Sequence, residues 1–228
     1  MRLLFQYIGL AMLLLALGAC SKAAPRPPSP VAVAASKTPA EQVDWAAMQA
    51  FWNRAMALPG IDTGPVDASK RMVVYFDPHC PVCAKQWQVL RPYLQQVRIH
   101  WVPVAYMDAS SARVAAAMLD ATDPVAALTT NEQNFDSKAN KGGYQPSAAP
   151  SAARVAQVER NTRLARQAGD LMGTPTLGFE LLRGQRYYRM TGLLESDAAR
   201  IAVADLGTTA DPWVKRRSGV APVPAPAA

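Results

Sequence analysis

Two cysteines separated by two residues, Cys80 and Cys83, are the side chains best suited to chemistry in this 228-residue chain. The apolar, β-branched run at 72–76 before them predicts a buried strand, and helical periodicity follows them. Residues three apart in the first turn of a helix lie on one face, within reach of a disulfide. Because unpaired N–H groups at a helix N-terminus favour thiolate, we expect Cys80 to be an exposed nucleophile and Cys83 a buried resolving thiol.

A C-x-x-C pair can also be half of a zinc site, which would need two further ligands. The third cysteine is Cys20, and the histidines are His79 and His100. This ligand count disfavours zinc, so we expect no metal and no cofactor beyond a redox-active Cys80–Cys83 disulfide. As an imidazolium, His79 would stabilise the neighbouring thiolate; an exposed loop histidine without an electrostatic role is the equal alternative.

The N-terminus has the pattern of an export signal. Arg2 precedes a short apolar run that closes in Leu-Gly-Ala before Cys20, which resembles a bacterial lipobox. We interpret residues 1–19 as a lipoprotein signal peptide and Cys20 as the lipidated residue, with an ordinary signal peptide as the alternative. Ser21 favours the outer membrane. The predicted location is therefore the periplasm, anchored to a bacterial membrane by lipid.

Composition limits the remaining possibilities. If Cys20 carries lipid, Cys80 and Cys83 form the only possible disulfide, so a hydrophobic core must hold the domain together. The net charge is +7, spread along the chain without a basic cluster interleaved with aromatic residues. Nucleic-acid binding is therefore not expected.

Composition also divides the chain. Residues 20–44 are rich in Pro and Ala and are interpreted as a tether, and residues 214–228 as a disordered tail. Between them, 45–213 is the expected domain. It opens with a predicted helix at 45–58, which either docks on its own domain, the favoured interpretation, or binds a partner. The apolar face of this helix consists of Trp45, Met48, Trp52 and Met56.

The order of the expected elements indicates an α/β fold. A strand at 72–76 is followed by a helix at 80–97, which Pro92 should kink, and by a strand at 99–106. A helical insert spans about 109–172, with a break at 141–146. A hairpin of strands 176–182 and 186–191 follows, and Ser196 is expected to cap a last helix.

A family resemblance rests on three motifs. The run 76–83 reads FDPHCPVC, residues 85–87 read KQW, and residues 173–175 read GTP. Together they resemble the bacterial periplasmic thiol:disulfide interchange proteins of the DsbG/DsbC type over about residues 70–206. The resemblance implies a thioredoxin-like fold with a helical insertion between the second strand and a cis-proline loop. The site residues it implies are the attacking Cys80, the resolving Cys83, their neighbours His79, Pro81 and Val82, and the substrate-binding loop residues Thr174 and Pro175.

The resemblance also implies an activity and partners. Family members reduce or reshuffle wrong disulfides of exported cysteine-containing proteins, or reduce sulfenic acids, and a membrane redox partner recharges the dithiol. The segment before the first strand is too short for the family's N-terminal dimerisation domain, so a monomer is expected. Val74 stands where thioredoxin has a buried acid. The alternatives are a DsbA-like oxidase and a non-enzymatic envelope adaptor lipoprotein that binds partners through 45–58 and 109–172.

Overall fold

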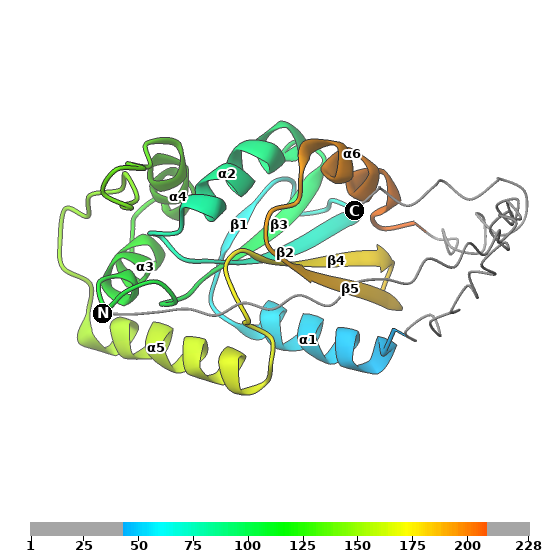
Figure 1. The fold of residues 1–228 in the computed structure, drawn as a ribbon, viewed down its shortest axis with the longest axis horizontal. Coiled ribbons are helices and arrows are strands. Elements are labelled where there is room, and N and C mark those ends of the chain that lie inside the picture. The colour runs from blue at the N-terminus through cyan, green and yellow to red at the C-terminus, as the bar shows by residue number, and fades with distance from the viewer. Residues whose placement is uncertain (1–42, 209–228) are drawn as a thin grey trace, which may run out of the picture. The chain divides into compact units, whose positions relative to one another are not determined.

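The computed structural model describes residues 43–208, which form a five-stranded sheet covered by helices (Figure 1). The predicted signal peptide, Cys20, most of the tether and the tail lie outside the described residues. The strands are β1 (Ile61–Thr63), β2 (Lys70–Phe76), β3 (Val97–Pro103), β4 (Thr176–Leu182) and β5 (Arg186–Thr191). Their order across the sheet is β1-β3-β2-β4-β5.

The centre of the sheet positions the two cysteines. Strands β2 and β3 are parallel and are connected by α2 (Pro81–Leu90), while β4 lies antiparallel on the other side of β2. Successive residues of β2 alternate between the two faces, and both faces are buried. This explains why the run at 72–76 is continuously apolar. The α/β class and the hairpin at 176–191 are confirmed.

Helices cover both faces of the sheet. Figure 1 shows α2 and α6 (Ser196–Asp205) on one side and α1 (Trp45–Ala57) and α5 (Ala152–Gln167) on the other. Trp87 of α2 packs with Val74 and Trp101 in the first core cluster. In the second cluster, Phe51 of α1 packs with Tyr75 of β2. The core therefore lies in two layers, one on each face of the sheet.

Helix α1 docks on its own domain, as the favoured interpretation predicted. Asp44 caps its start by accepting a hydrogen bond from Ala47 N at 3.0 Å. The ring of Trp52 stacks on Tyr187 of β5 with 5.0 Å between ring centroids. The helix also lies close to β4, since a Cβ added at Gly178 would meet Phe51 Cε1 at 2.7 Å. The buried face includes Phe51 rather than Trp45.

The helix after the cysteines is shorter than expected. It ends at Leu90 and continues as a single 3-10 turn, Arg91–Tyr93. Pro92 has no N–H for an α-helical bond, and its ring collides with the carbonyl four residues earlier. Strand β3 accordingly begins at Val97 and ends at Pro103, two to three residues before the expected bounds. The edge strand β1 was not predicted, because three residues give no measurable periodicity.

The insert contains α3 (Ser111–Leu119), α4 (Pro124–Gln133) and α5. The break between helices is longer than the expected 141–146, because α4 ends at Gln133 and α5 begins at Ala152, and it holds an isolated bridge between Asp136 and Lys141. In α6 the N-cap is Glu195, and Ser196 is the first helical residue, so the predicted serine cap is wrong by one position. Within the described residues, no helix is long and apolar enough to cross a membrane.

Replacing Trp52 by Ala should lower the free energy of unfolding by about 3–5 kcal/mol, because a buried ring and its stacking partner are lost. Denaturant unfolding followed by circular dichroism measures this change. Trp45→Ala is the matched control and should cost less than about 1 kcal/mol, since Trp45 contributes mainly a cation–π contact with Arg186. Equal losses for both variants would contradict the assignment of α1 to the core.

Candidate active site

The two cysteines lie at the N-terminus of α2, just beyond the carboxyl end of β2. Cys80 is the N-cap residue, and its sulfur accepts a hydrogen bond from Cys83 N at 3.3 Å. Pro81 occupies the first helical position, where its missing N–H is not needed. Both thiols are free, and Cys80 is 3% and Cys83 1% exposed. The expectation of an exposed Cys80 is therefore wrong: the surrounding loops cover most of it.

The surroundings of the two thiols shift their pKa values in opposite directions. Hydrogen bonding from the Cys83 thiol and from the backbone N–H groups of Val82 and Cys83 lowers the pKa of Cys80 to about 6, against the opposing effect of burial. Burial, followed by the hydrogen bond to Cys80, raises the pKa of Cys83 well above its usual range. At neutral pH the sulfur of Cys80 is therefore a thiolate and that of Cys83 a thiol. This is the division of roles expected from their order in the helix.

The loop before β4 completes the site on the other side of Cys80. The Thr174–Pro175 peptide bond is cis, as the resemblance implied. Cys80 Sγ lies 3.3 Å from the carbonyl oxygen of Thr174 and donates to it when protonated. The buried hydroxyl of Thr174 also faces Cys80 and contributes to the lowered pKa of its thiol. The structure thus brings together the two predicted halves of the site, which are 94 positions apart in sequence.

His79 fits neither of its two predicted roles. It is 5% exposed, and its Nδ1 accepts a hydrogen bond from Gly142 N at 3.2 Å. Burial, assisted by the charge of Lys141, lowers the pKa of His79. An imidazole that accepts at Nδ1 carries its proton on Nε2 and is neutral. His79 therefore supplies no positive charge to the thiolate and instead attaches the cysteine loop to the insert.

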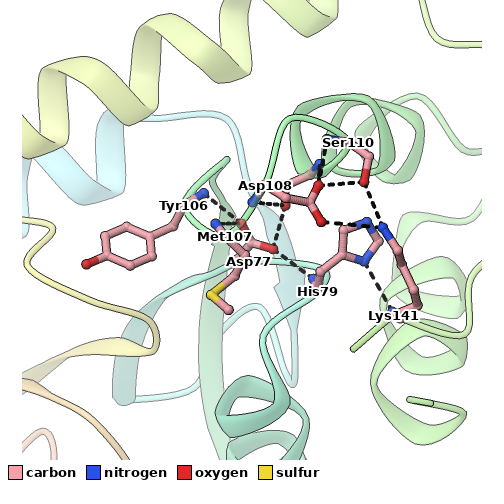
Figure 2. A network of polar contacts seen from close by, with 9 residues as sticks. Asp77, His79, Tyr106, Met107, Asp108, Ser110 and Lys141 are labelled. Atoms are coloured by element: carbon pink, nitrogen blue, oxygen red, sulfur yellow. Dashed lines mark hydrogen bonds and ion pairs between the residues drawn. The ribbon is translucent and has the colours of Figure 1, made fainter. Parts of the chain in front are cut away.

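Asp77 fixes the turn that carries the cysteines (Figure 2). Its fully buried carboxylate accepts hydrogen bonds from His79 N and Ser111 Oγ, each at 2.8 Å. It also accepts from Tyr106 N at 2.6 Å and Met107 N at 2.8 Å. One side chain thereby joins the loops that follow β2 and β3 and the start of α3.

A second polar group lies behind His79 (Figure 2). Lys141 Nζ is 3.4 Å from Asp108 Oδ2 and 3.1 Å from Ser110 Oγ. The Ser110 hydroxyl and its backbone N–H lower the pKa of Asp108 to about 2, so this carboxylate remains charged. The loop between α4 and α5 is therefore linked to the loop after β3.

Two further buried residues near the cysteines, Asn131 and Glu132 of α4, were not predicted. Asn131 Nδ2 donates to the carbonyl oxygen of Pro78 at 2.9 Å. Val74, at the position of the missing strand acid, is buried in the apolar core. The sequence could not reveal this pair, because polar residues within a helix are common. Only the contact of Asn131 with the distant turn at Pro78 sets it apart from other polar residues. Among the described residues, no three His, Cys, Asp or Glu side chains cluster as metal ligands.

The comparisons with known proteins agree with this geometry. No family model matches the chain. A 101-residue stretch is 29% identical to the thiol:disulfide interchange protein DsbG of Pseudomonas aeruginosa, covering 43% of this chain and 40% of that protein. The chain thus matches less than half of the length of this relative.

Solved structures define the fold. A periplasmic thioredoxin-like protein from Salmonella enterica superposes with a TM-score of 0.53 at 19% identity, covering 68% of this chain and 94% of that one. The catalytic domain of Proteus mirabilis ScsC gives 0.54 at 20% identity, covering 70% and 96%. The fold is thioredoxin-like. The predicted insertion between the second strand of the motif, β3, and the cis-proline loop is present as α3 to α5.

Replacing Asp77 by Asn should lower the free energy of unfolding by about 3 kcal/mol, because an amide nitrogen would face donors that now bond a charged oxygen. Thermal and denaturant unfolding measure the change. Asp123→Asn is the matched control: Asp123 caps α4 by accepting from Ala126 N, and Asn caps equally well. If both variants unfold like the wild type, Asp77 does not hold the turn.

Proposed function

We propose that this chain is a thiol:disulfide oxidoreductase of the reductase and isomerase type, acting on disulfides or oxidised cysteines of exported proteins. The observation that carries the proposal is the position of Cys80, at the N-cap of α2 and 3.3 Å from the carbonyl oxygen of the cis-proline loop. The similarity to DsbG of Pseudomonas aeruginosa supports it.

The reaction follows from the two thiol environments. The Cys80 thiolate attacks one sulfur of a client disulfide, and the other client sulfur leaves as a thiolate. Cys83 then attacks Cys80 Sγ, which releases the client reduced and leaves a Cys80–Cys83 disulfide. The backbone of Thr174 and Pro175 borders Cys80 and can pair with an extended client segment as an added strand. A membrane redox partner would return the pair to the dithiol.

Replacing Cys83 by Ala should trap clients, because the mixed disulfide on Cys80 can no longer be resolved. Non-reducing gels of cells expressing the variant should show adducts that disappear on reduction. The double variant Cys80→Ser/Cys83→Ala is the control and should show none. If the single and double variants formed equally abundant adducts, Cys80 would not be the attacking residue.

A second candidate direction is oxidation of client thiols. The lowered pKa of Cys80, about 6, stabilises the reduced pair and so makes its disulfide more oxidising. The resting redox state in cells decides between the directions, read by alkylation of free thiols before electrophoresis. A predominantly dithiol pool supports the reductase and isomerase proposal, and a predominantly disulfide pool supports an oxidase.

We further propose that the chain is a periplasmic protein held to a bacterial membrane through lipidated Cys20, with the outer membrane favoured by Ser21. The wild type should incorporate radiolabelled fatty acid and sediment with membranes. Cys20→Ser should lose the label, since no other cysteine lies beside the small residues of the N-terminal motif. Equal labelling of both forms would exclude this anchor.

A further inference from the structure

Positive charge is concentrated on one helix of the domain. Helix α5 carries four arginines and a single acid, which are Arg154, Arg160, Arg163, Arg166 and Glu159. Every other helix in the part of the chain that the structure describes carries at most one basic residue. Basic residues that are spread along the sequence as a whole are therefore denser on this helix than on any of its neighbours.

The outer face of α5 carries charge that the domain does not neutralise. Arg160 and Arg163 are three positions apart, so they lie on one face of the helix, and both are exposed. Among the described residues neither of them forms an ion pair, whereas Arg154 pairs with Asp120 at 2.7 Å. The charges of Arg160 and Arg163 are consequently available to a partner outside the domain.

Apolar surface lies beside these charges. Leu164, on the same face of α5, is 52% exposed. A hollow of about 510 Å³ opens between α5 and α1, and Leu164, Leu58 and Ala168 are among the side chains that line it. The charged residues of this lining, Arg54 and Asp170, pair with each other at 2.7 Å. The outer face of α5 thus joins uncompensated positive charge to apolar surface.

We propose that this face of α5 docks on the surface of an anionic lipid bilayer. Cationic side chains are attracted to the negative potential of anionic head groups, and a leucine between them enters the boundary between head groups and acyl chains. An acidic polypeptide would complement Arg160 and Arg163 but not Leu164 and the apolar hollow beside it. A lipid surface complements all of them.

The proposed lipid anchor gives the domain access to such a surface. Cys20 and Asp44, the N-cap of α1, are 24 positions apart, and a chain of that length spans at most about 85 Å. Docking through α5 does not cover α2, because the two helices lie on opposite sides of the sheet (Figure 1). The start of α2, where the cysteines lie, therefore remains accessible to clients. Docking of this kind requires neither the cysteine pair nor its redox activity.

Vesicle co-sedimentation tests the docking in the absence of the lipid anchor. The mature chain from residue 20 with Cys20→Ser carries no acyl group. It should bind vesicles made of equal parts phosphatidylcholine and phosphatidylglycerol, and it should not bind vesicles of phosphatidylcholine alone. Raising the salt concentration from about 0.05 M to about 0.5 M should release it, because salt screens the attraction between exposed charges.

Arg160→Glu/Arg163→Glu should weaken binding to the anionic vesicles by at least about tenfold, because two attractive charges become repulsive. Arg91→Glu/Arg200→Glu is the matched control: it makes the same change of charge at exposed arginines after α2 and in α6, on the other side of the sheet. This control should bind within about threefold of the wild type, because charges far from the contact are screened.

Leu164→Gln should weaken binding by about fivefold and leave its salt dependence unchanged, because an apolar contact is lost but no charge. Circular dichroism should show wild-type folding for every variant, since all the replaced side chains are exposed.

Three outcomes overturn the docking. The first is a chain that does not bind the anionic vesicles at low salt. The second is equal binding by the two double variants, which would mean that net charge and not α5 determines binding. The third is an Arg160→Glu/Arg163→Glu variant that keeps wild-type vesicle binding but is no longer captured by immobilised polyglutamate, which would identify an acidic protein as the partner. The client-trapping and fatty-acid labelling experiments decide the proposed function separately, so the two failures are distinguishable.

Discussion

The sulfur of Cys80 accepts a hydrogen bond from the amide of Cys83 at the first turn of α2. This contact lets a thiol replace the hydroxyl or carboxylate that usually caps a helix, and a thiolate accepts the bond better than a thiol does. The sheet positions both segments that surround the Cys80 sulfur. The parallel pair β2 and β3 directs the turn to the end of the sheet, and β4 brings Thr174 to the other side of the sulfur.

Two polar anchors hold that turn from opposite directions. Asp77 ties it to the loop after β3 and to α3, while Asn131 ties Pro78 to α4. Asp77 bonds the backbone N–H groups of His79, Tyr106 and Met107 besides the Ser111 hydroxyl, and Asn131 bonds a backbone carbonyl, so both side chains set the path of the chain. The helical insert is consequently part of the site, because it supplies residues that hold the cysteine turn. His79 follows the same pattern, because its ring accepts from the backbone of Gly142.

The insert also contributes a buried acidic residue, whereas the sheet does not at the position of Val74. In this sheet the interior position at Val74 is apolar and packs with Trp87 and Trp101, so a carboxyl there would have no polar neighbour. The buried acid Glu132 of α4 instead lies beside Asn131, which donates a hydrogen bond to the carbonyl oxygen of Pro78 in the turn before the cysteines.

Local patterns in the sequence determined the cysteine pair, the strand before it, the hairpin at 176–191 and the helical character of the insert, because each depends on neighbours a few residues apart. Pro92 marked the right place but ended the α-helix rather than kinking it. Only the tertiary structure decided the neutral state of His79, the near-complete burial of Cys80 and the places of Asp77 and Glu132. These properties depend on burial and on contacts between distant segments, such as the 53 positions between Pro78 and Asn131, which no local pattern records.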